Sequence, residues 1–348
     1  MMKMNKWTVG LAAAGVVSLA STAQAEENSV LTALSSTVIS GNVEASYNGT
    51  FSKSNNLYGD QGFVADGVSL AIGSPLGEGD YSAGYNVELL LGQRAEDFQQ
   101  GAGDFLVKNA NIGLNVPFGN GIDLTVGLFD TIVGYEVEAS GANPNVDRSY
   151  GFDLEPFTHT GLLASTSLSD SISVSLGLAN AFDSTADLHN GTIDGDGNFA
   201  YLAGLEITAP ESLGFLAGST LYVGYVDGAS VGADNDDEDS LFYVGGSMAS
   251  PIDGVSLGVA YDDREYGNGQ ADADAVALYA VWDVSDGVSL AGRYDTLDDG
   301  SDTKSMWSAT LGYSIWENVL SRLEYNYVTG DREDGDSSAI AVNLFYQF

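Results

Sequence analysis

The sequence predicts an all-β protein, an antiparallel up-and-down transmembrane β-barrel of about 16 strands. Apolar and polar residues alternate with period two in runs that recur about every twenty residues, as in strands with an apolar medium on one face and water on the other. Short turns and longer polar loops join these runs alternately, which is typical of transmembrane barrels. After the N-terminal segment no run approaches 18 consecutive apolar residues, so helical membrane spans are excluded.

Composition narrows the class of protein further. The chain has 44 glycines but only 6 prolines, which suits strands and tight turns better than helices. Cysteine is absent, so neither disulfides nor thiolate metal sites contribute. A net charge of −38 argues against nucleic acid and anionic membrane surfaces as partners.

The N-terminus has the features of a secretory signal peptide. Lys3 and Lys6 precede an apolar segment at residues 7–20, and Ala23-Gln24-Ala25 places small residues at a cleavage site. The segment is too short to span a bilayer as a helix, which disfavours the alternative of an uncleaved anchor. We therefore expect a signal peptide at residues 1–25 and a barrel at 26–348, exported through the periplasm.

The first five strands are predicted at residues 37–48, 62–73, 81–91, 105–116 and 122–128. In the first, apolar residues share one face and polar residues the other. The apolar set is Ile39, Val43, Ala45 and Tyr47, and the polar set is Ser40, Asn42, Glu44 and Ser46. Short turns at 74–79 and 117–121 join the second strand to the third and the fourth to the fifth.

The remaining strands follow the same rhythm to the last residue. The sixth to ninth are predicted at 161–168, 172–178, 199–207 and 220–227, and the next three pairs flank turns at 250–254, 283–287 and 314–318. The sixteenth ends the chain, with Ile340, Val342, Leu344, Tyr346 and Phe348 on one face. An even count puts both ends of the barrel on the periplasmic side. A soluble β-sandwich would alternate too, but this many long hairpins without a helix exceed what one core needs.

The alternation stops for about thirty residues only at Asp130–Thr160, and a gap of that length is usually functional. In a barrel that starts at the periplasmic side, it is the third outward loop. A wide barrel offers such a loop one sheltered surface, the wall of its lumen. We expect the loop at 131–159 to fold into the lumen and narrow the pore; the alternative is an ordinary surface loop.

The same region carries a family resemblance. Gly127-Leu-Phe-Asp130, Gly134-Tyr-Glu136, Asn143-Pro144, Arg148-Ser-Tyr150 and Glu155-Pro-Phe-Thr-His-Thr-Gly161 resemble the signature of the OmpL-like β-barrel porins of bacteria. The terminal Phe348 is also similar to the ending of outer-membrane barrels. The resemblance covers about 35 residues closely and implies a porin in the bacterial outer membrane, although it brings no functional residues with it.

Charged residues that would line the pore can be read from the polar parity of the strands. On the lumen wall we expect Glu44, Glu88, Glu206, Arg264, Arg293 and Arg322, and on the loop Glu136, Glu138, Asp147, Arg148, Asp153 and Glu155. Loop acids facing wall arginines across a gap would create a transverse field, within a Debye length of about 8 Å. Alternatively, the arginines pair with wall carboxylates such as Glu324 and hold the loop in place.

Metal binding and catalysis find little support. Asp194, Asp196 and Asn198 copy the start of a calcium loop, but Phe199 and Leu205 stand where it needs glycine and glutamate. No cofactor is expected, and calcium or magnesium at the acidic outer loops remains the alternative. The two histidines are His159 and His189, and no catalytic motif accompanies them. We expect His159 to pin the root of the loop.

The function expected is therefore that of a porin, a passive diffusion channel for small hydrophilic solutes. Carboxylate-lined pores favour cations, so cations are the expected preference, weakened if the loop acids are paired. Outer-membrane lipid surrounds such a barrel, and a homotrimer is expected by analogy. The alternatives are a substrate-specific channel, a structural or adhesive barrel and, last, an outer-membrane hydrolase.

Overall fold

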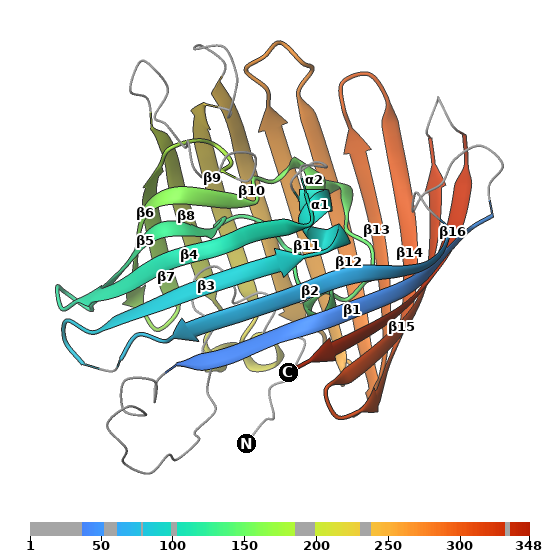
Figure 1. Cartoon of the computed structure of the whole chain (residues 1–348), viewed down its shortest axis with the longest axis horizontal. Coiled ribbons are helices and arrows are strands. Elements are labelled where there is room, and N and C mark those ends of the chain that lie inside the picture. Colours follow the sequence, from blue (N-terminus) through green and yellow to red (C-terminus); the bar gives the residue numbers. More distant parts are fainter. Residues whose placement is uncertain are drawn as a thin grey trace.

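The computed structural model describes residues 37–51, 61–77, 79–98, 103–184, 199–229, 238–330 and 335–348. Sixteen antiparallel strands form one closed barrel, in which each strand pairs with its neighbours in sequence and β1 pairs with β16 (Figure 1). The strands are β1 (Val38–Thr50), β2 (Gly62–Ser74), β3 (Ala83–Leu91), β4 (Phe105–Val116), β5 (Ile122–Asp130), β6 (Thr158–Ser169), β7 (Ile172–Ala179), β8 (Ala200–Thr208), β9 (Thr220–Ala229), β10 (Glu238–Ala249), β11 (Val255–Glu265), β12 (Ala273–Ser285), β13 (Val288–Asp298), β14 (Thr303–Trp316), β15 (Val319–Thr329) and β16 (Ser337–Gln347). The predicted fold class and strand count are confirmed.

Within the described residues, four short helical segments lie in the connections: α1 (Gln93–Phe98), η2 (Ser140–Ala142), α2 (Tyr150–Leu154) and η3 (Glu211–Leu216). None of the helices that the structure describes is long and apolar enough to be a membrane span. The predicted signal peptide lies outside the described residues.

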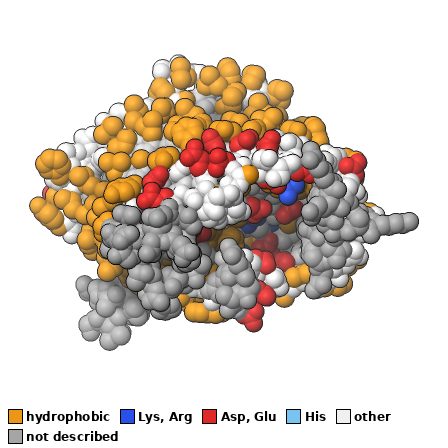
Figure 2. Space-filling model, turned by 90° about the horizontal axis from the view of Figure 1, so that it is seen from above, with side chains coloured by type: hydrophobic (Ala, Val, Ile, Leu, Met, Phe, Trp, Pro, Cys, Tyr) orange, Lys and Arg blue, Asp and Glu red, His pale blue; other side chains and the backbone are white. Residues whose placement is uncertain are grey.

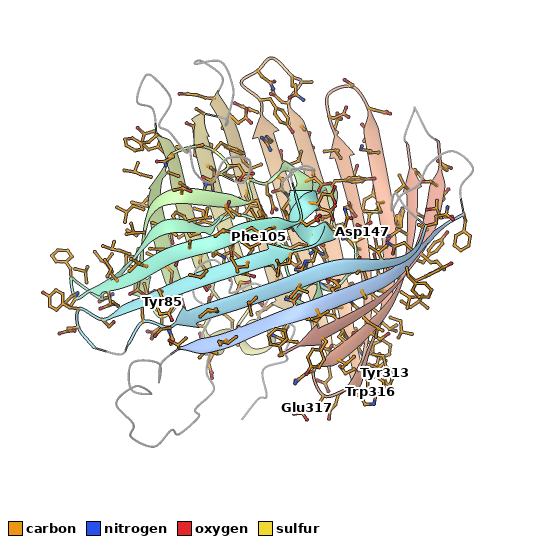
Figure 3. The ribbon with its side chains drawn as sticks, viewed as in Figure 1. Tyr85, Phe105, Asp147, Tyr313, Trp316 and Glu317 are labelled. Carbon is orange, nitrogen blue, oxygen red and sulfur yellow. The ribbon has the colours of Figure 1, made fainter. Side chains whose placement is uncertain are left out.

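The barrel closes where the last residue meets the first strand. Gly41 and Phe348 exchange two backbone hydrogen bonds, of 3.1 and 3.0 Å. Within β16, Val342, Leu344 and Tyr346 are exposed while the residues between them are buried, so the predicted two-residue rhythm holds. We call the face that carries these exposed apolar residues the outer face of the wall, and the other the inner face. Aromatic side chains such as Tyr313 and Trp316 project outward near the end that carries the short turns (Figure 3).

Strand boundaries differ from the prediction mainly at two places. The third strand begins at Ala83 because Tyr81 belongs to the turn, with a φ of 59°. The sixth begins at Thr158, which is three residues earlier than predicted, so the long connection spans residues 131–157 and is named the third loop below. The third loop also contains η2 and α2, which the alternation pattern did not reveal.

Candidate functional site

The third loop begins by packing on small residues of the inner face. Val133 and Leu154 belong to one buried apolar cluster with residues of β5 to β12. A Cβ on Gly224 of β9 would lie 2.5 Å from Val133, and one on Gly258 of β11 would lie 2.0 Å from the hydroxyl of Tyr135. Glycine at these two wall positions therefore allows the loop to approach the backbone of the strands.

Arg293 of β13 is a fully enclosed anchor. Its side chain has 0% exposure and forms ion pairs with Glu136 at 2.9 Å and Asp295 at 2.8 Å. It also donates to the backbone carbonyls of Asp147 at 2.6 Å and Arg148 at 2.9 Å. Arg293 therefore holds two separate stretches of the loop against the wall.

Arg322 of β15 holds the middle of the loop through backbone oxygens. It donates to the carbonyls of Ser140, Asn143 and Asn145 at 2.7, 3.3 and 3.0 Å. Because its guanidinium is nearly inaccessible, these carbonyls replace the water that a charged group otherwise needs.

Glu324 of β15 binds the next turn of the loop from the same wall. Its carboxylate accepts the backbone N–H groups of Val146 at 2.6 Å and Asp147 at 2.9 Å, and the hydroxyl of Thr310 at 2.6 Å. Burial, and next the nearby charge of Glu324, raise the pKa of Asp147 to about 7.

On the other side, α1 folds against the same loop. Arg94 forms ion pairs with Glu138 of the loop and, at 3.4 Å, with Glu44 of β1. Phe98 stacks on Phe157 with ring centroids 3.9 Å apart. The second outward connection thus contributes a charged and an aromatic contact to the third loop.

The end of the loop returns along β11. Arg264 donates to the carbonyl of Leu154 at 2.9 Å and pairs with Asp239 at 2.6 Å. The carboxyl groups of Glu155 and Asp262 share a hydrogen bond, which requires a proton. Burial first, and then the charge of Asp262, raise the pKa of Glu155 well above its ordinary value.

Lys108 and Asp130 stand at the root of the loop. Lys108 of β4 pairs with Glu88 at 3.0 Å and with Asp130 at 2.9 Å, and its ammonium lies 6.0 Å from the ring centroid of Phe157. Asn109 donates to both carboxylates at 3.1 Å. Asp130 keeps a side-chain exposure of 42% in this cluster, whereas Glu88 keeps 17%.

Most of these contacts to the third loop involve a basic residue. Of the 11 basic residues, Lys3, Lys6, Lys53 and Arg332 lie outside the described residues. All the others belong to the third loop or contact it: Arg94, Lys108, Arg148, Arg264, Arg293, Lys304 and Arg322. The scarce positive charge of the described chain is concentrated on one loop.

The predicted site residues lie in different environments. Glu136 and Glu138 are buried, with 5% and 4% exposure; Asp147, Arg148 and Glu155 are half-buried, and Asp153 is exposed. On the wall, Glu44, Arg293 and Arg322 are buried, while Glu88, Glu206 and Arg264 are half-buried. Glu206 accepts a hydrogen bond from Tyr222 at 3.3 Å rather than contacting the loop.

The expected open gap between the loop acids and the wall arginines is wrong for Arg293 and Arg322. Both arginines touch the loop directly, because burying a guanidinium requires several acceptors within hydrogen-bond reach. The alternative that the arginines hold the loop agrees with these contacts. However, they use loop carbonyls and Glu136, and Glu324 binds loop N–H groups instead.

Several contributing residues were missed. Lys108 stands at a register shift between β3 and β4, so strict alternation puts its side chain on the wrong face. Arg94 lies on a helix of six residues, too short for a periodic signal. Only the run Gln93–Phe98 between two strands, with good helix formers, could have indicated it.

The structure describes His159 but not the other histidine or the residues that resemble a calcium loop. His159 is a residue of β6 rather than of the loop, is fully buried, and lies 3.1 Å by its Nε2 from the hydroxyl of Thr131. That hydrogen bond ties the first loop residue to the strand that follows it. His189, Asp194, Asp196 and Asn198 lie outside the described residues. Among the residues that are described, no three His, Asp or Glu side chains group as metal ligands.

The end of the molecule with the longer loops is hollowed. Figure 2, seen from above, shows acidic side chains on several sides of this hollow. In Figure 3, Asp147 lies within the barrel outline, where the third loop meets the far wall. A closed antiparallel barrel of an even number of strands, with an apolar outer face and a polar inner face, is the architecture of outer-membrane β-barrels.

Solved structures of that class share the fold. OmpT of Vibrio cholerae in its trimer form has a TM-score of 0.60 at 16% identity, covering 90% of this chain and 99% of its own. The anion-selective porin from Comamonas acidovorans has a TM-score of 0.64 at 12% identity, covering 90% and 99%. Salmonella typhi OmpF, in complex with daunomycin, has a TM-score of 0.63 at 17% identity, covering 90% and 97%. A search of curated proteins found no match.

The family model described as "putative beta-barrel porin-2, OmpL-like" matches residues 36–345. The chain belongs to this family, and the predicted resemblance is confirmed. It is a porin of the bacterial outer membrane.

Proposed function

We propose that this porin is a passive diffusion channel for small hydrophilic solutes, that it prefers cations, and that the third loop narrows its pore. The observation that carries the proposal is the convergence of the described basic residues on that loop. Lys and Arg that bind loop carboxylates and carbonyls are no longer free to attract anions.

The position of the loop contacts supports the role in constriction. From its root at β5 and β6 the loop reaches Arg293 on β13, Arg322 on β15 and Arg94 of α1. These contacts are spread around more than half of the ring of strands. A segment fixed at that many places reduces the opening by a set amount rather than moving as a lid.

The preference for cations is inferred from the carboxylates that have no basic partner among the described residues. The chain carries 49 acidic residues. Asp66, Asp123 and Glu206 lie half-buried on the inner face of β2, β5 and β8, and the described part of the chain gives none of them an ion pair. Unpaired carboxylates along a pore attract cations within about 8 Å at physiological salt.

Planar bilayer recordings test the channel. The purified full-length protein is expected to insert in discrete conductance steps, and its reversal potential in a KCl gradient is expected to have the sign of K⁺ permeation. A pure, folded protein without steps would refute the channel and favour a structural or adhesive barrel. Saturable block by one sugar or oligopeptide would favour a substrate-specific channel instead.

The assembly proposed is a homotrimer, and its support is the trimer form described for Vibrio cholerae OmpT. Light scattering of the detergent-solubilised protein measures the mass directly. A monomer mass at all concentrations tested would contradict the proposal.

A further inference from the structure

We propose that, among the carboxylates at the third loop, Asp130 and Asp153 set the cation preference, whereas the buried acids of the loop only hold it in place. This inference rests on the proposed function, since it assigns selectivity within the same pore. It differs from the sequence-based expectation, which gave all the loop acids one role and did not include Asp130.

The acids with the best-formed ion pairs are poorly placed to act on ions. Glu136 is paired with Arg293, and Glu138 with Arg94, and the two carboxyl side chains are only 1% and 2% exposed. A permeating ion cannot touch carboxylates that are this enclosed. The contacts of Glu136 and Glu138 fit a structural role, in which each carboxylate fixes the loop to its partner arginine.

Asp153 is different because it lies on the free side of α2. Gly151 and Leu154 of this helix are buried, and a Cβ on Gly151 would lie 2.3 Å from the carboxylate of Asp262 on β11. Asp153 is the exposed residue of this helix, and within the described residues it has no ion pair.

Asp130 presents a carboxylate from the opposite wall. Lys108 and Asn109 hold its two oxygens in place, at 2.9 and 3.1 Å. Lys108 also neutralises Glu88, so the cluster retains one net negative charge, and Asp130 is its most exposed ionised group, at 42%. A carboxylate that is both fixed and accessible suits repeated contact with passing ions.

The two carboxylates stand on facing sides of the barrel. Asp130 ends β5, while α2 packs against β11, β12 and β13. In the closed ring of 16 strands, β5 and β12 are seven strands apart, which is nearly diametric. Asp130 and Asp153 therefore carry accessible negative charge at two separate parts of the ring.

Neutralisation of each group tests the assignment in planar bilayers, with the full-length protein in a KCl gradient. Asp130→Asn and Asp153→Asn are each expected to lower the ratio of K⁺ to Cl⁻ permeability about threefold at 0.1 M salt, and the double variant about tenfold. Glu265→Gln is the matched control. Glu265 is the last residue of β11 and lies on the outer face of the wall, so this substitution also removes one exposed carboxylate but not one on the inner face. Its permeability ratio is expected to equal that of the wild type.

The outcomes separate this inference from the proposed function. A wild-type protein that conducts, with a double variant of unchanged ratio and intact β-sheet circular dichroism, overturns the assignment and leaves the porin standing. A wild-type protein that forms no channel refutes the proposed function itself. If one single variant fails to fold, the other still tests its own carboxylate against Glu265→Gln.

Discussion

Substitution of Arg293 by Met should release the third loop and leave the barrel intact. The side chain has 0% exposure, so its removal leaves Glu136 and Asp295 as buried carboxylates without their partner. Breaking a buried pair in this way costs about 3–5 kcal/mol. The backbone ladders of β13 with β12 and β14 do not involve this side chain, so the penalty falls on loop docking. A loss of about 3 kcal/mol lowers the ratio of docked to undocked loop by more than about a hundredfold.

Trypsin provides a direct assay of this release. In the docked loop, Arg293 binds the carbonyl of Arg148, which is the carbonyl that trypsin attacks. Arg293→Met is expected to be cut after Arg148 much faster than the wild type and to give larger, noisier conductance steps. Adding Glu136→Gln to Arg293→Met removes one of the two buried carboxylates left without a partner. The double variant should therefore regain part of the protection of Arg148 from trypsin. Wild-type conductance together with an uncut Arg148 in Arg293→Met would refute the role of this arginine as an anchor.

Two further predictions use the same trypsin assay. Gly258→Val places a side chain where the Tyr135 hydroxyl now lies, 2.0 Å from the ideal Cβ, so it should expose the loop; Gly292→Ala, with only a 4.0 Å contact, should not. The raised pKa of Glu155 means that the docked loop binds this proton more tightly than the undocked loop does. Docking should therefore be strongest below about pH 4.5 and weaken as pH rises through the raised value, and cleavage should increase over that range. Glu155→Gln keeps a hydrogen-bond donor for Asp262 and should flatten this pH dependence; an equally steep profile in that variant would contradict the explanation.

The wall of the barrel was predictable from sequence because its physics is local. Each residue of β16 faces either lipid or the inside, and that choice determines whether it is apolar, so Leu344 and Asn343 reveal their faces without reference to any partner. β4 was predicted at its observed limits for the same reason. The start of β3 differs from the prediction because Tyr81 takes a left-handed conformation in the turn before it.

The site was only partly predictable because its partners are distant in sequence. Parity along the strands predicted Arg293 and Arg322 on the inner face, and both residues are buried and contact the loop. Their partners depend on how the third loop lies, and that depends on three-dimensional features such as the glycine at position 258. No periodic pattern could show that a six-residue helix brings Arg94 to Glu138, which is 44 residues away.

The uneven distribution of charge explains why the number of acids alone is a poor guide to selectivity. A net charge of −38 suggests that any carboxylate in the lumen attracts cations. Yet the bases of the described chain gather at the loop, where they neutralise Glu136 and Glu138 and leave Asp153 unpaired. Loss of one basic residue should therefore do more than change the charge by one unit, because it also frees the loop segment that the residue held. Selectivity and pore size should change together in arginine variants such as Arg293→Met, but selectivity alone should change in Asp130→Asn and Asp153→Asn, and this difference separates anchoring charges from those that contact ions.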